Sequence, residues 1–283
     1  MPRARVWLNI FFAAAAALFS QGCAEPRTER AAEIFGTKIT ITILNLPEAQ
    51  AAAAIGDALA HMENMHRRFH AWRPGELHAL NQIAAAGKLP ATVSAPMAAM
   101  LSQSAEYSRR SEGLFNPAAG GLFRLWGFHA DTPPKKPPSA AAVSVYLAAL
   151  PDMRNIKMRG QVLQSAPDTA QFDFGGIAKG AALDAAKKIL LRRGVKNALI
   201  NVGGNIMALG KNGKRQWRIL LHPAGRRVEL KDGEAAATSG DSQRFFIYEG
   251  RRYHHIIDPR TGNPAQNASA ASAISDDAQN AGA

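Results

Sequence analysis

The chain has 283 residues, of which 47% are hydrophobic and 20% are charged, and its 34 Lys and Arg residues against 22 Asp and Glu residues give a formal net charge of +12. This length and this hydrophobic share support one large or two modest folded domains, and they exclude a disordered chain. The single cysteine excludes an internal disulfide, a zinc site built on several cysteines and a cysteine-ligated iron–sulfur cluster.

The N-terminus has the layout of a signal peptide, over residues 1–22. Arg3 and Arg5 precede an apolar run from Val6 to Phe19. This run of about 14 residues is shorter than the roughly 20 that cross a bilayer. The residues just before Cys23 resemble a bacterial lipobox, except that a serine stands where an aliphatic residue is usual. We therefore expect an exported protein that a lipid on Cys23 anchors to the membrane, facing the periplasm, with an ordinary secreted protein as the alternative.

After a polar linker over residues 23–33, the chain alternates strands and helices. Residues 37–43 alternate polar and apolar side chains, which predicts a half-buried strand. Helices are predicted where apolar residues recur at helical spacing between Gly or Pro residues. They span 48–69, 76–85, 95–111 and 140–150, with the proline-rich stretch 131–139 as a loop.

The second half combines one long helix with many short strands, which predicts a mixed sheet of the α+β class. A predicted strand that ends at Asp173 leads through Gly175-Gly176 into a helix that runs to about Arg193. Glycines at such a turn let a phosphate approach the backbone, and the helix N-terminus supplies amide donors. Lys179 lies in the first helical turn, within reach of the same phosphate. Asp173 either binds a cation or caps the helix.

The alternative for this turn is tight packing without a ligand, because its spacing fits neither a Walker A loop nor a full Rossmann fingerprint. A second glycine turn, Gly203-Gly204, follows a predicted strand over 197–201 and indicates either a close backbone approach or a plain hairpin. Further on, His255 precedes Asp258 by three residues at a predicted strand end. A histidine near a carboxylate is a candidate acid/base group, whereas an isolated histidine is more often structural.

Together these motifs resemble the ApbE family of flavin transferases (FAD:protein FMN transferases), along nearly all of the chain after the signal peptide. No single motif decides the resemblance, but their number and order do. The segments are Phe35-Gly36-Thr37, Phe69 to Asn81, Gly113 to Pro117, Leu125 to Phe128, Asp173 to Asp184, Val202-Gly203-Gly204, Trp217, Thr238-Ser239-Gly240 and His255 to Gly262.

The resemblance implies a single compact α+β unit over residues 34–283, ApbE-like and related to the T-fold. It implies a Mg²⁺-dependent transfer of the FMN half of FAD to a Thr or Ser hydroxyl of an exported acceptor flavoprotein, with release of AMP. His255 is then the candidate base, oriented through the turn at Asp258, and the backbone carbonyl of Gly176 is expected to face the metal. The implied FAD-binding residues are Phe35, Trp72, Leu114, Phe115, Asn116, Asp173, Lys179 and Ile257.

Two positions depart from the family pattern. Gly282, in Ala281-Gly282-Ala283, stands where the family has the Asp of Ala-Asp-Ala, so it brings no carboxylate to the metal. We expect a chain that lacks the usual C-terminal end and its Asp or Thr ligand, with Asp276 and Asp277 as nearby substitutes. Asn116 replaces the family's usual Asp beside the cofactor.

Two further functions stay open, the first because of these departures and the second because transfer and hydrolysis attack the same phosphorus. One is an FAD-binding lipoprotein that transfers no FMN, and the other is a Mg²⁺-dependent FAD pyrophosphatase that uses water and yields FMN and AMP. Nucleic-acid binding is not expected, because the positive residues are dispersed and form no nucleic-acid motif.

Overall fold

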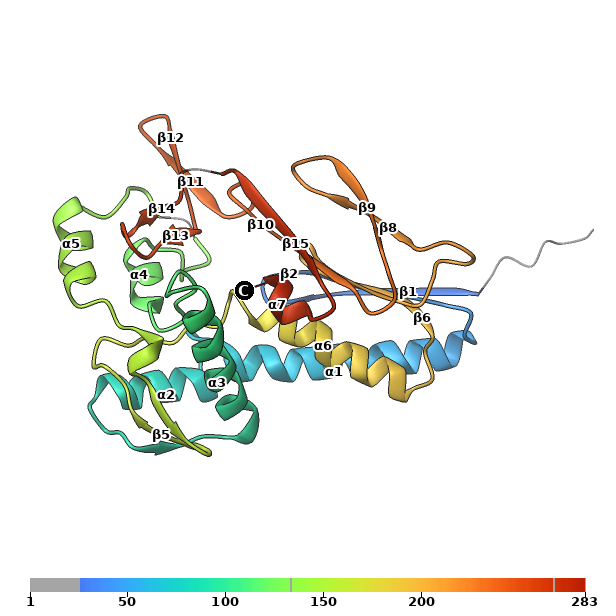
Figure 1. The fold of residues 1–283 in the computed structure, drawn as a ribbon, viewed down its shortest axis with the longest axis horizontal. Helices are drawn as coiled ribbons and strands as arrows, with labels where there is room; N and C mark the ends of the chain where they lie inside the picture. The colour runs from blue at the N-terminus through green and yellow to red at the C-terminus, as the bar shows by residue number, and fades with distance from the viewer. Residues whose placement is uncertain (1–25, 133, 267, 283) are drawn as a thin grey trace, which may run out of the picture.

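A computed structural model describes residues 26–132, 134–266 and 268–282, so the predicted signal peptide and Cys23 lie outside the described residues. A long sheet with two helices beneath it occupies one half of the molecule, and shorter helices and hairpins make up the other half (Figure 1). Among the residues that the structure describes, no helix is both long enough and apolar enough to span a bilayer.

The main sheet has six strands, and each neighbouring pair in it is antiparallel. The α+β class is therefore confirmed, but the sheet is antiparallel and not mixed. The predicted strands at 37–43 and 197–201 are confirmed, and Gly203-Gly204 turns a hairpin. In spatial order the strands are β1 (Arg27–Ile34), β2 (Thr37–Leu44), β6 (Asn197–Val202), β7 (Asn205–Leu209), β10 (Ala235–Gly240) and β15 (Ala270–Ser275).

The segment expected to be a linker is mostly strand β1, so that prediction was wrong. Phe35 and Gly36 both have positive φ, 58° and 66°, and form a tight hairpin turn that brings β1 against β2. As an edge strand, β1 leaves most of its side chains exposed. Its polar composition therefore reflects an exposed edge and not an absence of structure.

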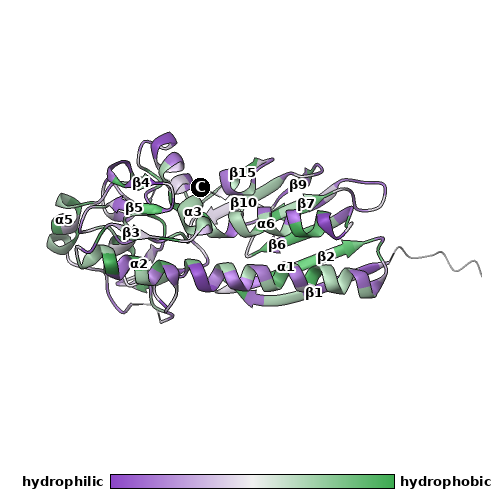
Figure 2. Cartoon of the chain, turned by 90° about the horizontal axis from the view of Figure 1, so that it is seen from below, coloured by the Kyte–Doolittle hydropathy of each residue, from purple (hydrophilic) through white to green (hydrophobic). Residues whose placement is uncertain are grey.

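Helices α1 (Glu48–Phe69) and α6 (Ala178–Arg192) pack side by side against the sheet (Figure 1). They enclose an aliphatic core in which Ile39, Ile41 and Ile43 of β2 are fully buried. In Figure 2, β2 and β6 are predominantly green, whereas α1 alternates between green and purple. Because α6 begins directly after Gly175-Gly176, the core fixes the position of the glycine turn.

The other half contains α2 (Glu76–Ala85), α3 (Ala95–Arg110), α4 (Gly120–Leu125), α5 (Ala140–Ala148) and the turn η1 (Met153–Asn155). A small sheet joins them, in the order β3 (Ala91–Thr92), β5 (Val162–Ser165), β4 (Lys157–Arg159). The predicted helices are confirmed to within two residues, and α4 is additional. A second core surrounds Phe172 and Phe174, and Phe35 and Met65 contact both cores.

The segment before Asp173 is extended, but it is not the predicted strand. Its only bridge is the parallel one between Ala119 and Gln171. The buried amide of Asn81 replaces a strand neighbour: its Nδ2 donates to the Phe172 carbonyl at 2.9 Å, and its Oδ1 accepts from the Phe172 N–H at 2.8 Å. Side-chain pairing of this kind satisfies the backbone without a ladder.

Three hairpins and a short helix complete the chain. β11 and β12 together form a hairpin that rises beside the helical half (Figure 1). The elements are β8 (Trp217–Leu221) with β9 (Arg226–Leu230), β11 (Phe245–Tyr248) with β12 (Arg251–His254), β13 (Ile257–Asp258) with β14 (Asn263–Pro264), and α7 (Ala278–Gly282).

Candidate functional site

The carboxylate of Asp173 organises the glycine turn. Its Oδ1 accepts the Gly175 N–H at 2.8 Å, and its Oδ2 accepts the indole N–H of Trp72 at 2.9 Å. The first residue of α6 is preceded by Ile177, and no side chain caps this helix end. Asp173 is therefore not the helix cap. Its bond to Trp72 brings together two of the predicted cofactor residues, which lie in opposite halves of the sequence.

A row of rings leads from the β1–β2 turn to this carboxylate. Phe35 contacts His66 edge to face with ring centroids 5.3 Å apart, and His66 contacts His70 at 5.2 Å. The His70 Nδ1 accepts the backbone N–H of Trp72 at 3.1 Å. Burial lowers the pKa values of His66 and His70, so both imidazole rings are uncharged at neutral pH. This apolar and aromatic surface suits a planar ring system.

The segment 114–116 also borders the glycine turn, through Phe115. A Cβ at Gly176 would lie 2.9 Å from the Phe115 ring, so a larger residue at 176 would have to displace that ring. Asn116 uses its amide within the fold, since Nδ2 donates to the Pro151 carbonyl at 2.8 Å. Leu114 is exposed. The structure thus brings Phe115 to the turn, while Asn116 holds the loop behind it.

Helix α7 approaches the same turn from the other side. A Cβ at Gly180 would lie 2.5 Å from the Ala278 carbonyl oxygen, so the two helices touch backbone to backbone. The Asp184 carboxylate accepts the N–H groups of Ala278 and Gln279, each at 3.3 Å. Burial raises the pKa of Asp184. These contacts place Gly282 beside the Gly176 carbonyl, where a Cβ at 282 would lie 3.5 Å from that oxygen.

The described residues do not fit a magnesium ion at the Gly176 carbonyl. Mg²⁺ requires oxygen ligands, usually with a carboxylate, and no group of three His, Cys, Asp or Glu side chains able to hold a metal occurs in the described ranges. The expected substitutes do not supply one. The Asp277 carboxylate accepts the N–H of Asn280 at 2.9 Å and so caps the N-terminus of α7. Gly282 lies at the other end of this helix, about 7 Å away, so Asp277 is directed away from the Gly176 carbonyl. Asp276 accepts the Ser275 hydroxyl instead.

His255 is held in one tautomer by the Arg244 carbonyl. Its Nδ1 donates to that oxygen at 3.2 Å, and its backbone N–H donates to it at 3.1 Å, which leaves Nε2 as an acceptor. Burial lowers the pKa of His255 to about 4, and the nearby charges of Arg244 and Lys179 act in the same direction. The ring is neutral at neutral pH and is able to accept a proton at Nε2.

Lys179 places a positive charge in this site. Within the described part of the chain, its ammonium group has no hydrogen-bond or ion-pair partner. Burial lowers the pKa of Lys179. Arg244 is a second cation here, and it is near enough to Asp173 for that carboxylate to raise its pKa against the larger, opposite effect of burial. A partly buried cation without a protein partner is suited to a phosphate ligand.

The carboxylate of Asp258 does not bind the imidazole of His255 directly, so orientation of His255 through the turn at Asp258 stays a prediction. This carboxylate accepts the Arg260 guanidinium at 2.6 Å and the Arg260 backbone N–H at 2.9 Å. The Asp258 carbonyl also accepts the Gly262 N–H. Asp258 therefore builds the turn, and Ile257 packs with the cluster around Trp126. Sequence reasoning missed Arg244, because its contribution to His255 is a backbone carbonyl that no motif records.

The chain resembles known flavin transferases along most of its length. The ApbE family profile matches residues 35–283. The chain is 42% identical over 248 residues to the FAD:protein FMN transferase of Rhodobacter capsulatus, covering 86% of this chain and 47% of that protein. It is 32% identical over 261 residues to the one of Treponema pallidum, covering 83% of this chain and 70% of that protein. It thus spans about half the length of the first relative.

Solved structures give the same comparison for the fold. The ApbE protein of Thermotoga maritima superposes with a TM-score of 0.82 at 26% identity, covering 90% of this chain and 84% of that one. The flavin transferase ApbE of Vibrio cholerae superposes with a TM-score of 0.77 at 25% identity, covering 91% and 84%.

Proposed function

The chain belongs to the ApbE family, and we propose that it transfers the FMN half of FAD to a Thr or Ser hydroxyl of an exported acceptor flavoprotein and releases AMP. The observation that carries the proposal is the arrangement of His255. Its Nε2 is an unprotonated acceptor, and the positive charges of Arg244 and Lys179 are close enough to lower the pKa of the ring. A neutral base beside positive charge is what the attack of a hydroxyl on a pyrophosphate requires.

The FAD substrate would lie along the ring row and the glycine turn. The flavin ring would have Phe35 and Trp72 as walls, and Phe115 packs in the same cluster, whereas Ile257 belongs to the separate cluster around Trp126. The pyrophosphate would meet Lys179 and the N–H groups at the start of α6, where the helix carries partial positive charge. Asp173 would act through Trp72 and Gly175, whose positions it fixes.

In the proposed step, the acceptor oxygen attacks the phosphorus of the FMN half. A new P–O bond forms, the bond from that phosphorus to the bridging oxygen breaks, and AMP leaves with the electron pair. The hydroxyl proton passes to Nε2 of His255. Lys179 and Arg244 stabilise the charge that develops on the phosphoryl oxygens and on the leaving phosphate. A bound Mg²⁺ supplies the same charge stabilisation, but the described residues do not fit it, so no step is assigned to it.

The test is a mass measurement on an acceptor peptide that contains one threonine. The chain is incubated with FAD and the peptide, with and without Mg²⁺. We expect the peptide to gain the mass of one FMN and AMP to appear in equal amount. His255→Gln should abolish most of the gain while FAD binding persists, and His61→Gln, an exposed histidine on α1, should behave as the parent chain. FMN and AMP without a peptide adduct would indicate a pyrophosphatase, and intact bound FAD would indicate a binding protein.

We also propose that the protein is exported as a lipoprotein anchored through Cys23. The support is the order of Arg3 and Arg5, the apolar run and the lipobox-like segment in the sequence. Expression in a bacterium with radiolabelled palmitate should label the parent chain and not Cys23→Ser. Label on both proteins, or on neither, would contradict the proposal.

A further inference from the structure

One end of the main sheet carries exposed cations that the proposed transfer step does not use. Strand pairing brings Arg27, Leu44 and Asn197 to the same end of three neighbouring strands, and β7 ends beside them at Leu209. In Figure 1 this end, where β1 begins, lies at one extreme of the long axis of the molecule. Four of its exposed cations form a set that we call the basic tip: Lys196, Lys211, Lys214 and Arg215.

Backbone hydrogen bonds hold the segments of the basic tip together. The Lys211 N–H donates to the Asn197 Oδ1 at 2.8 Å, which ties the chain after β7 to the start of β6. Asn212 and Arg215 exchange two backbone hydrogen bonds, of 2.9 and 3.2 Å, and so close the turn that carries Lys214. The backbone of the basic tip is therefore fixed, and its charged side chains extend from a defined surface.

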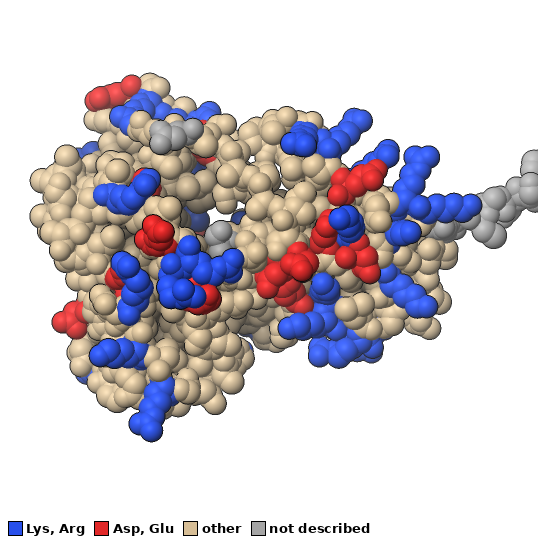
Figure 3. Space-filling view, viewed as in Figure 1, with Lys and Arg blue, Asp and Glu red and all other residues tan. Residues whose placement is uncertain are grey.

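The basic tip has a surplus of positive charge. Within residues 26–132, 134–266 and 268–282, none of its four side chains takes part in an ion pair, whereas the nearby Arg193 is paired with Asp57. The carboxylate of Asp232 contacts this end of the sheet, where its Oδ1 accepts the Gly210 N–H at 2.7 Å. Figure 3 shows Lys and Arg side chains along the outer rim of this half of the molecule. Such a surface attracts anions.

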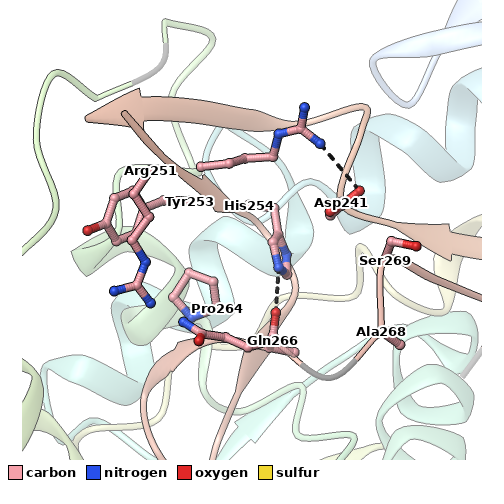
Figure 4. Close-up of a pocket in the computed structure, with 10 residues that line it drawn as sticks. Asp241, Arg251, Tyr253, His254, Pro264, Gln266, Ala268 and Ser269 are labelled. Atoms are coloured by element: carbon pink, nitrogen blue, oxygen red, sulfur yellow. Dashed lines mark hydrogen bonds and ion pairs between the residues drawn. The ribbon is translucent and has the colours of Figure 1, made fainter. Parts of the chain in front are cut away.

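The arginines of the β11–β12 hairpin, in the other half of the molecule, do not form a comparable surface. The Arg251 guanidinium stacks on the Tyr253 ring, 5.2 Å from its centre. The Arg252 guanidinium stacks on the Phe245 ring at 4.5 Å and also lies 3.7 Å from the Asp241 carboxylate. Successive side chains of a strand point to opposite faces, and Figure 4 shows Arg251 and Asp241 on opposite sides. These two charges are therefore separated, and one is partly neutralised.

The proposed lipid anchor brings the basic tip toward the membrane. Cys23 precedes Arg27 by four residues, so even a fully extended chain keeps Arg27 within about 14 Å of the lipidated cysteine. Neighbouring strands are about 4.8 Å apart, so Asn197, two strands from Arg27, lies about 10 Å from it. The potential of an anionic bilayer falls off within a Debye length of about 8–10 Å. A lipid on Cys23 therefore holds the basic tip close to the region where that potential acts.

We propose that the basic tip binds the anionic phospholipid headgroups of the membrane that carries the lipid anchor. The inference rests on the proposed anchor at Cys23 for the position of the membrane. An acyl anchor and a basic surface together attach a protein more firmly than either one alone, and the second contact also orients the protein. β1 runs for eight residues, about 27 Å, from this end to the turn at Phe35. The FAD region would then stand about that far above the headgroups.

Vesicle binding tests the basic tip without the lipid anchor. The probe is the chain from residue 23 with Cys23→Ser, which keeps every residue of the hydrophobic cores. It is sedimented with vesicles of phosphatidylcholine alone or of an equal mixture with phosphatidylglycerol. We expect binding to the anionic vesicles that weakens as the salt concentration rises. K196Q/K211Q/K214Q/R215Q should lower this affinity at least about twentyfold, because each cation near an anionic surface contributes about fivefold.

A matched variant separates the basic tip from overall charge. K135Q/K136Q/K157Q/R159Q removes the same number of exposed lysines and arginines from the helical half and should leave vesicle binding nearly unchanged. Melting temperature and FAD titration show whether each variant is folded. Equal losses in the two quadruple variants, or equal binding of the probe to neutral and anionic vesicles, would overturn the proposal.

Labels at the two ends of the molecule test the orientation. The Cys23→Ser chain has no other cysteine, so Asn212→Cys in the basic tip and Asn155→Cys in η1 each accept a single fluorescent label. With anionic vesicles whose headgroups carry a nitroxide quencher, we expect quenching at position 212 and not at position 155. Equal quenching at both positions, or quenching at 155 alone, would overturn the proposal. The expected quenching in a protein that takes up no palmitate at Cys23 would support the basic tip and count against the anchor alone.

Discussion

The indole N–H of Trp72 donates to the Asp173 carboxylate at 2.9 Å, across 101 residues of sequence. This bond ties the loop after α1 to the turn that begins α6. Because the other oxygen of Asp173 holds the Gly175 N–H, the position of the ring wall and the position of the glycine turn depend on the same carboxylate.

Trp72→Phe is expected to weaken FAD binding about tenfold, because it keeps the ring but leaves Asp173 without its indole donor. The measurement is a titration of flavin fluorescence. The control is Trp217→Phe, which removes a comparable bond, from Nε1 to the Leu209 carbonyl at 2.9 Å, at the far end of the sheet. That variant should lose thermal stability without losing FAD affinity. A similar loss of affinity in both variants would show that the Trp72 effect is only structural.

Lys179→Met should stabilise the protein without FAD and weaken FAD binding. Burial depresses the pKa of this lysine, so the charged form is disfavoured in the empty site, and an apolar side chain of similar length avoids that cost. Loss of the ammonium removes a contact to the pyrophosphate, which we expect to lower the affinity about tenfold or more. Melting temperature and FAD titration are measured together.

Lys187→Met is the matched control for Lys179→Met, since Lys187 lies two turns further along α6 and its ammonium donates to the Gly233 carbonyl at 3.4 Å. It should leave FAD binding unchanged. The account of Lys179 fails if both lysine variants bind FAD as the parent chain does.

The helical part of the fold was predictable from the sequence, because apolar spacing alone determines the buried face of α1, α2 and α3. β1 was not predictable in this way. Its polar side chains face solvent, as is usual for an edge strand, and its pairing with β2 depends on the turn at Phe35-Gly36. The strand expected before Asp173 failed for a related reason, because the side chain of Asn81 replaces the neighbouring strand.

The candidate site was predictable as a set of residues and not as a set of contacts. The motifs named Trp72, Asp173, Lys179 and His255, but the bond between Trp72 and Asp173 joins distant segments. The group that orients His255 is a backbone carbonyl, which is independent of side-chain identity. Asp258 was paired with His255 because only three residues separate them in the sequence. Arg260 is only two residues away, and its guanidinium binds the Asp258 carboxylate.

Low pH should destabilise the protein through His255. In the unfolded chain its imidazole titrates near 6.5, whereas in the folded protein burial lowers its pKa to about 4. Between these values the unfolded state binds a proton that the folded state does not, so the contribution is fully present above pH 6.5 and is lost as the pH falls toward 4. Urea unfolding at pH 7.5 and pH 5 should show a smaller pH effect for His255→Gln than for the parent chain. An equal pH effect in the two proteins would contradict the buried neutral state.

Gly180→Ala should displace α7. The added Cβ would lie 2.5 Å from the Ala278 carbonyl oxygen and 2.6 Å from the Gln279 Cα, and neither backbone atom is able to move independently of the helix. We expect a loss of about 1–3 kcal/mol in the free energy of unfolding, typical of overpacking. Gly56→Ala, on an exposed position of α1 with nothing within 4 Å, should instead be neutral or raise stability. A neutral Gly180→Ala would mean that α7 does not pack on α6 as described.

Gly282→Asp should create a divalent-cation site. A Cβ at position 282 would lie 3.5 Å from the Gly176 carbonyl oxygen and 3.4 Å from the Asn205 Nδ2, so the Cβ itself makes only ordinary contacts there. The aspartate carboxylate would add to that carbonyl the charged oxygen ligand that the described residues do not provide, and Mg²⁺ and Mn²⁺ favour such ligands. We expect Mn²⁺, followed by its paramagnetic resonance in the presence of FAD, to bind at least about tenfold more tightly than to the parent chain. Gly282→Asn has nearly the same size without the charge and should not show the gain. If the aspartate and asparagine variants bind Mn²⁺ equally, position 282 does not face the Gly176 carbonyl in the way that the geometry requires.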